Sequence, residues 1–148
     1  MFFFRVENNT RGIEIIADID AACFDPPWRI QQWRAEIENP ENHIFLISKD
    51  RELLSPTGFF SFGISGDCAE LRKIAVLPAY RRQHIADMAM SKLREEARLL
   101  KLDNILVEVA ITNLAAIRLY EKHIFYKISI RKKYYNNLVD ALVLQKEI

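Results

Sequence analysis

The sequence predicts an α/β domain built on a mixed sheet with helices on both faces. Two observations support this prediction of the fold class. Half of the 148 residues are apolar, which is enough for one sizeable core, and short strand-like runs alternate with longer amphipathic runs. No repeat, linker or low-complexity tract interrupts that alternation. We therefore expect a single domain over residues 1–148, with elements in the order β-α-α-β-β-β-α-β-α-β-β.

The N-terminal elements are marked by a helix cap and a pair of prolines. Residues 2–7 suit a first strand, and Asn9 or Thr10 can cap a helix that runs to about Cys23. The consecutive prolines at 26–27 end that helix, because proline lacks an N–H and clashes with the preceding turn.

The next four elements are a short helix and three strands. A helix is predicted over 30–37, followed by a buried strand at 44–48. Phenylalanine and isoleucine alternate with other residues over 57–65, which is typical of a strand with one apolar face. A glycine-containing turn at 66–67 leads into a further strand at 68–77.

The second half of the chain alternates strand and helix and then ends in two strands. A stripe of apolar residues predicts a helix from about Arg82 to Leu100. An apolar strand follows at 104–110, and Thr112 or Asn113 caps a helix that ends near residue 122. The closing elements are strands at 125–133 and 138–145 and the turn between them at Asn136 and Asn137.

Composition excludes several classes of protein. The net charge of +1, from 21 basic and 20 acidic residues, argues against a nucleic-acid partner. No apolar run is long enough for a signal peptide or a membrane span, which favours a cytoplasmic protein without a membrane partner. Cys23 and Cys68 are isolated and are expected to be buried, reduced thiols. The histidines lack metal-ligand spacing, so no metal is expected; they are His43, His84 and His123.

The most informative stretch is the strand-to-helix turn at residues 81–86. Arg81 and Arg82 precede a helix whose first turn has unpaired N–H groups and the positive end of the helix dipole. Such a turn is typical of an anion site. Phosphate sites usually have glycine where the backbone closes on the anion, but this chain has His84 there.

The order of elements, together with six motifs, resembles the Gcn5-related N-acetyltransferase fold. Within that fold, the chain is similar to the bacterial ribosomal-protein N-terminal alanine acetyltransferase family, and the resemblance covers nearly the whole chain. The matching segments are residues 22–28, 74–83, 106–109, 113–121, 131–135 and 140–144.

This resemblance implies an enzyme, an acetyl-CoA-dependent N-acetyltransferase. Glu108 would be the general base and Tyr120 the general acid for the leaving thiolate. Trp28, Tyr134 and Tyr135 would border the acceptor, the N-terminal peptide of a protein, with a ribosomal protein as one candidate. We expect a monomer or a weak homodimer. The residues implied to contact acetyl-CoA are Ile74, Ala75 and Val76 along the pantetheine arm, Arg81, Arg82, Gln83, His84, Ile85 and Ala86 around the pyrophosphate, and Asn113.

The implied residue types suit direct transfer from a thioester to an amine. A carboxylate can remove the proton of the amine, directly or through one water, and a tyrosine hydroxyl can donate toward sulfur. An N-terminal amine has a pKa of ~7.7–8.0 and lysine ~10.4, so deprotonating lysine at neutral pH costs about 3.5 kcal/mol more. A single glutamate therefore favours an α-amine acceptor. No covalent acyl-enzyme is needed, so neither cysteine is expected to act as a nucleophile.

The chain departs from the family's pattern at two glycines. His84 replaces the first glycine of the acetyl-CoA turn, and Ile124 replaces the glycine that usually ends the helix of Tyr120 in a left-handed conformation. A side chain in that conformation costs about 1–2 kcal/mol. We hypothesise that acetyl-CoA binding is weakened but retained.

Each candidate residue also has a purely structural interpretation. Glu108 could be an exposed strand residue, Tyr120 or Trp28 a core aromatic, and Asn113 a helix cap. The two arginines of the turn could be a solvated pair, and the basic and aromatic run at 131–135 could be a nucleic-acid patch. Two other functions also remain open: a small-molecule amine acetyltransferase on the same scaffold, and a CoA-binding module with reduced or lost turnover.

Overall fold

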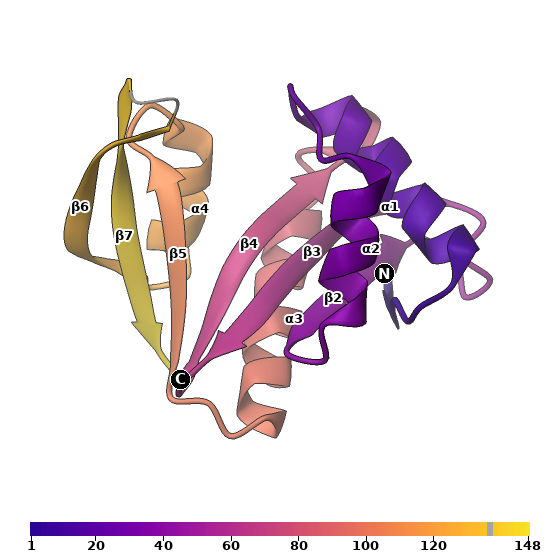
Figure 1. Ribbon diagram of the computed structural model, residues 1–148, viewed down its shortest axis with the longest axis horizontal. Coiled ribbons are helices and arrows are strands. Elements are labelled where there is room, and N and C mark those ends of the chain that lie inside the picture. The colour runs from indigo at the N-terminus through magenta and orange to yellow at the C-terminus, as the bar shows by residue number, and fades with distance from the viewer. Residues whose placement is uncertain (136–137) are drawn as a thin grey trace. The chain divides into compact units, whose positions relative to one another are not determined.

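The computed structural model describes residues 1–135 and 138–148, without the side chains at 134 and 135. Its helices and strands follow the predicted order (Figure 1). The predicted turn at Asn136 and Asn137 lies outside the described residues. The elements are β1 (Phe2–Arg5), α1 (Thr10–Cys23), α2 (Ile30–Glu38), β2 (Asn42–Ser48), β3 (Pro56–Ser65), β4 (Cys68–Val76), a 3₁₀ turn (Pro78–Tyr80), α3 (Ile85–Leu99), β5 (Asn104–Ala110), α4 (Leu114–Lys122), β6 (Tyr126–Tyr135) and β7 (Val139–Glu147).

Seven strands form a mixed sheet in the order β1-β2-β3-β4-β5-β7-β6, which confirms the predicted fold class. The contacts within the chain define two compact units. Unit 1 comprises Met1–Gly63 and Lys73–Ala89, and unit 2 comprises Ile64–Arg72 and Met90–Ile148.

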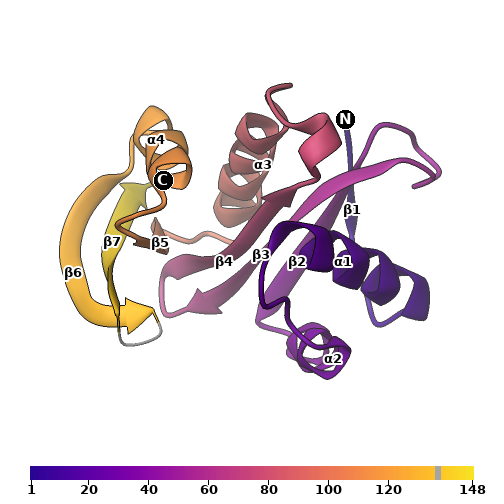
Figure 2. The same ribbon diagram turned by 90° about the horizontal axis from the view of Figure 1, so that it is seen from above.

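Unit 1 contains an antiparallel set of strands covered by α1 and α2 (Figure 2). The β2 strand pairs with β1 from Phe2↔Ser48 to Arg5↔Phe45, and with β3 from Asn42↔Gly63 to Ser48↔Pro56. Asn9 caps α1, since its side-chain oxygen accepts from the N–H of Gly12 at 2.7 Å. The core of this unit joins the helices to the strands; its largest members are Ile16, Trp33, Ile44, Leu46 and Phe59.

A close backbone approach in unit 1 depends on glycine at position 58. A Cβ placed on Gly58 would lie 2.3 Å from the carbonyl oxygen of Ala75 and 3.3 Å from the Cα of Val76. These are backbone atoms of β4, which cannot rotate away as a side-chain end can. The bare backbone of Gly58 therefore lets β3 pass close to the segment predicted to bind pantetheine.

Unit 2 places β7 between β5 and β6. The β5 strand pairs in parallel with β4 from Cys68↔Asn104 to Leu71↔Val107, and antiparallel with β7 from Asn104↔Glu147 to Ala110↔Ala141. The β6 strand is the last in the sheet order, and its residues from Tyr126 to Lys133 are exposed. Figure 1 shows α4 beside these strands, and Lys146 Nζ of β7 donates to the carbonyl of His123 just after that helix.

The start of α3 differs from the prediction. The sequence pattern placed it near Arg82, but the helix begins at Ile85. Arg82 and His84 have φ values of 61° and 60°, which are left-handed and incompatible with an α-helix. Residues 81–84 are therefore a turn, which an apolar stripe in the sequence could not distinguish from a first helical turn.

The end of α4 has the hydrogen bonds of a Schellman motif. Phe125 N–H donates to the carbonyl of Tyr120 at 3.0 Å, and Ile124 N–H donates to the carbonyl of Glu121 at 2.9 Å. The rings of Tyr120 and Phe125 also pack, with centroids 5.7 Å apart. Ile124 occupies the left-handed position of the motif at φ 66°, although it is β-branched and its side chain is largely exposed. The motif that usually contains glycine is thus kept without it.

Replacing Ile124 with glycine is expected to raise the free energy of unfolding by about 1 kcal/mol, because glycine adopts this φ without steric strain. Urea unfolding followed by circular dichroism measures the change. The control is Ile128→Gly, which truncates another exposed isoleucine of unit 2. Ile128 lies in a strand, where glycine is unfavourable, so this control should destabilise the protein. A loss of stability in Ile124→Gly would contradict the strain assigned to this position.

Candidate functional site

The predicted anion-binding turn lies in unit 1, and its backbone keeps the conformation that glycine would permit. His84 has φ 60°, and its side chain is 80% exposed. The Nδ1 atom of His84 lies 3.1 Å from Oδ2 of Asp87, in the first turn of α3. The ring therefore pairs with an acidic side chain of the helix start, and the backbone N–H groups of a left-handed turn remain in place.

The two arginines of this turn differ in their contacts. Arg81 Nε donates to the carbonyl of Val76 at 2.9 Å, so this guanidinium is held by β4. Arg82 is exposed and forms no hydrogen bond or ion pair with the part of the chain that the structure describes. Its guanidinium is thus available to an anion beside a helix N-terminus.

Glu108, the predicted general base, lies in unit 2 on β5 and is one-third exposed. Nη1 of Arg131, on β6, donates to both of its carboxylate oxygens, at 2.8 Å and 3.1 Å. Between these two strands runs β7, where the fully buried Ala141 pairs with Arg131. A small residue at this position lets the arginine side chain reach across β7 to Glu108.

Arg131 is a functional candidate that sequence reasoning missed. From its residue type it belongs to the basic and aromatic run at 131–135, one of the segments similar to the family, and no role of its own was predicted for it. Its partnership with Glu108 depends on the register of β6 on β7, which shifts between Lys127 and Ser129 and again between Arg131 and Tyr135. Because such irregularities cannot be read from residue types, no sequence signal could have identified the pair.

Asn113 precedes α4 in unit 2, and Tyr120 lies in the last turn of that helix. Asn113 caps the helix, since its side-chain oxygen accepts from the N–H of Ala116 at 3.2 Å. Tyr120 is buried, at 4% exposure, and its ring packs on Phe125. The cap and the ring contact are the structural roles that the sequence left open for these residues. Neither role prevents the Asn113 amide or the Tyr120 hydroxyl from meeting a ligand.

Trp28, the predicted acceptor-binding residue of unit 1, follows the α1 helix and is half-buried. Its ring lies 4.6 Å from that of Trp33, centroid to centroid, and its backbone N–H donates to Asp20. The backbone of Tyr134 and Tyr135 lies in β6, but their side chains lie outside the description. The other predicted contacts divide between the units: Ile74, Ala75, Val76, Arg81, Arg82, Gln83, His84, Ile85 and Ala86 belong to unit 1, and Glu108, Asn113 and Tyr120 to unit 2.

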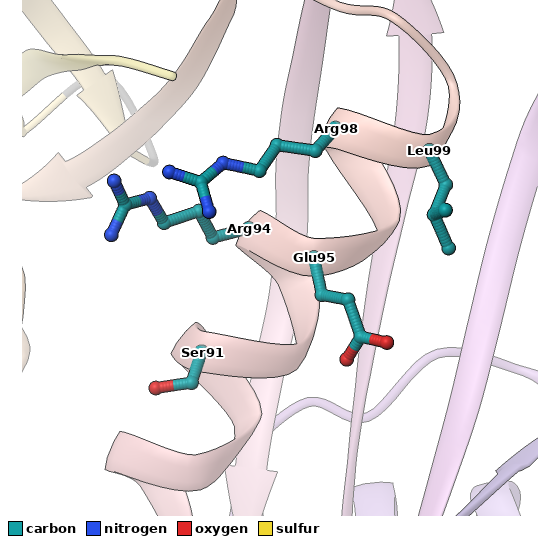
Figure 3. Close-up of a pocket in the computed structure, with 5 residues that line it drawn as sticks. All are labelled: Ser91, Arg94, Glu95, Arg98 and Leu99. Carbon is teal, nitrogen blue, oxygen red and sulfur yellow. The ribbon is translucent and has the colours of Figure 1, made fainter.

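Unit 2 also has two basic depressions on α3. Figure 3 shows the first, of about 400 Å³, with Arg94 and Arg98 extending from the same side of the helix. The second, of about 290 Å³, reaches Lys146, and burial lowers the pKa of Lys146, with smaller contributions from the charges of Arg94 and Arg98. None of the site residues predicted from the sequence lines either depression.

Over residues 1–135 and 138–148, no group of three or more histidine, cysteine, aspartate or glutamate side chains is arranged to hold a metal ion. Within the same residues, no helix has the length and apolar character needed to cross a membrane.

The sequence comparison identifies the class of protein. The model of the acetyltransferase (GNAT) family matches residues 13–125, so the chain belongs to this family and is an N-acetyltransferase. A protein of Bacillus subtilis (strain 168) named "Putative [ribosomal protein bS18]-alanine N-acetyltransferase" is 31% identical over 134 residues, which cover 89% of this chain and 87% of that protein.

Solved structures share the fold. The ribosomal-protein-S18-alanine N-acetyltransferase from Escherichia coli superimposes with a TM-score of 0.86 at 23% identity, covering 99% of this chain and 94% of that one. The matching chain in the NatC complex bound to Gag peptide and CoA gives a TM-score of 0.80 at 21% identity, covering 100% of this chain and 99% of that one. At these identities the likeness concerns the fold alone.

Proposed function

We propose that this chain transfers the acetyl group of acetyl-CoA to the α-amine of a protein N-terminus, with an N-terminal alanine of a ribosomal protein as the acceptor. The observation that carries the proposal is the left-handed backbone at Arg82 and His84, a conformation that suits an anion-binding turn and is present although the glycine is absent. The acceptor class is supported by the name of the Bacillus subtilis relative.

On this proposal, unit 1 binds the cosubstrate. The N–H groups of the turn at 81–86 and the guanidinium of Arg82 hold the pyrophosphate, while backbone groups of residues 74–76 meet the pantetheine arm. Arg81 keeps its bond to the carbonyl of Val76 and so fixes the turn to β4. Acetyl-CoA supplies an activated acetyl group as a thioester.

Unit 2 supplies the proton transfers. The carboxylate of Glu108 takes the proton of the acceptor ammonium, directly or through one water, so that a neutral amine attacks the thioester carbon. Arg131 holds both oxygens of that carboxylate and so limits its rotation. The hydroxyl of Tyr120 protonates the departing thiolate, and Asn113 contacts the cosubstrate while it caps α4.

The acceptor peptide is assigned to Trp28 in unit 1 and to Tyr134 and Tyr135 in unit 2. Trp28 is held by its neighbours and is only half-buried. An α-amine suits the single glutamate because it is easier to deprotonate at neutral pH than a lysine side chain.

The decisive experiment compares acceptors. The protein is incubated with acetyl-CoA and one acceptor at a time. The acceptors are a peptide that begins with alanine, the same peptide with a blocked α-amine, a polyamine, and a free amino acid. Mass spectrometry should show one acetyl group on the α-amine of the free peptide only. Acetylation of the small amines alone would favour the small-molecule alternative. Thiol release that is equal in the wild type, Glu108→Gln and Tyr120→Phe would favour a module without turnover.

His84→Gly is expected to bind acetyl-CoA a few-fold more tightly than the wild type, because removing the Cβ lets the backbone approach the phosphate more closely. Calorimetric titration measures both affinities. Asp87→Asn is the matched control, since it removes the acidic partner of the ring but keeps the turn residue. No binding to either folded protein would contradict the hypothesis that this turn retains acetyl-CoA binding.

A further inference from the structure

A buried ion pair in unit 1 takes no part in the proposed chemistry. Asp20 of α1 is fully buried, and Lys73 of β4 keeps 11% of its side chain exposed. Lys73 Nζ lies 2.7 Å from Oδ1 of Asp20. Taking two charges out of water is costly, and apolar residues of similar volume often serve stability equally well. The role of the pair therefore lies in the residues that it contacts.

Asp20 holds the segment that joins α1 to α2. Its second carboxylate oxygen accepts from the backbone N–H of Trp28 at 2.8 Å and from the indole N–H of Trp33 at 3.1 Å. One carboxylate thus binds a backbone group, a buried indole and the ammonium of Lys73. Removing it would leave all three donors without this acceptor.

Lys73 holds the same segment through its aromatic rings. Its Nζ lies 4.4 Å from the ring centroid of Phe24, 4.6 Å from that of Trp28 and 5.7 Å from that of Trp33. A desolvated cation over an aromatic face is attracted to it. Trp28 is therefore fixed twice, at its backbone by Asp20 and at its ring by Lys73, while the residue as a whole is only half-buried.

We infer that Asp20 and Lys73 are positioning residues, which hold Trp28 as a rigid wall for the N-terminal segment of the acceptor. The inference rests on the proposed function and adds two residues to its acceptor site. The negative charge of Asp20 offsets the positive charge of Lys73, so the cationic amine of an incoming peptide is not repelled there. A rigid aromatic surface suits a peptide whose first side chain is small and apolar.

The kinetic test uses two variants. The first is Lys73→Met. The second, the charge-free variant, combines Lys73→Met with Asp20→Asn, so that both charges are removed while the asparagine side chain keeps an oxygen for the N–H donors. The KM for the alanine peptide should rise about tenfold, which corresponds to about 1.4 kcal/mol. The kcat and the KM for acetyl-CoA should stay within about twofold. The double variant keeps the test valid if Lys73→Met alone does not fold.

A matched background shows whether the pair acts through Trp28. In Trp28→Ala, adding Lys73→Met and Asp20→Asn should raise the peptide KM no further. An unchanged peptide KM in the charge-free variant, or a rise of equal size in the Trp28→Ala background, would overturn the inference.

A binding measurement separates this inference from the proposed function. Trp28 and Trp33 are the only tryptophans of the chain, so the intrinsic fluorescence reports this cluster. Titration with the alanine peptide, without acetyl-CoA, should change the emission of the wild type with a Kd about tenfold lower than that of the charge-free variant. Trp28→Phe should abolish most of the change. If the wild type neither binds nor acetylates the peptide, the proposed function and the inference are overturned together. If the wild type does both and the charge-free variant binds the peptide with the same Kd, the inference alone is overturned.

Discussion

Replacement of Glu108 by glutamine is expected to lower the kcat of acetyl transfer at pH 7 about 10²–10⁴-fold, the range typical of a lost general base. Glutamine has nearly the same size, and its oxygen can still accept from Arg131, but it cannot take a proton at this pH. Initial rates at saturating acetyl-CoA and alanine peptide measure the effect.

The pH dependence of this variant makes the test sharper. An N-terminal amine loses its proton unaided above a pKa of ~7.7–8.0, so the deficit of Glu108→Gln should shrink as the pH is raised from 7 to 9. Glu147→Gln, an exposed glutamate on β7 in the same unit, is the control and should stay within twofold of the wild type. A kcat at pH 7 equal to that of the wild type would contradict the assignment of Glu108 as the base.

Replacement of Gly58 by alanine is expected to lower the free energy of unfolding by about 3 kcal/mol, the upper part of the range for overpacked cores. The added methyl would lie 2.3 Å from the carbonyl oxygen of Ala75, so β3 or β4 must move. The KM for acetyl-CoA should rise as well, because Ala75 and Val76 belong to the proposed pantetheine segment. Urea unfolding and steady-state kinetics measure the two effects.

Gly66→Ala isolates the conformational part of this cost. Gly66 has φ 59°, and a Cβ placed there meets no atom within 4 Å, so only backbone strain of about 1 kcal/mol is expected. The acetyl-CoA KM should not change in that control. Equal losses of stability in the two variants would show that the contact with Ala75 is unimportant.

Much of the fold could be predicted because its elements carry local signals. The strand Asn104–Ala110 was predicted to the residue from its apolar run. The helix from Leu114 to Lys122 was predicted with its cap at Thr112 or Asn113 and its end near residue 122, and the structure shows Asn113 as the cap. The start of α3 was wrong by three residues, because left-handed backbone at Arg82 and His84 leaves no mark in side-chain type. The strand order, with β7 between β5 and β6, is likewise a property of long-range pairing.

The sequence predicts those residues of the candidate site whose type determines their chemistry. It does not predict the distant side chains that contact them. Glu108 and Tyr120 came from the resemblance, and Arg81 and Arg82 from the helix start. Their surroundings required coordinates: Arg131 reaches Glu108 across β7 from 23 positions away, and Lys73 reaches Asp20 from 53 positions away. Contacts at such separations depend on the packing of whole elements, which periodicity alone does not specify.

The place of β6 at the end of the strand order has a consequence for solubility. An edge strand of ten residues leaves a row of backbone groups open to pairing with another chain, and this one exposes Tyr126, Ile128 and Ile130. Basic side chains are interspersed along the same strand. When two copies approach edge to edge, these like charges repel each other, so the strand resists aggregation while keeping its apolar side chains. Besides Arg131, which pairs with Glu108, the charged members are Lys127, Lys132 and Lys133.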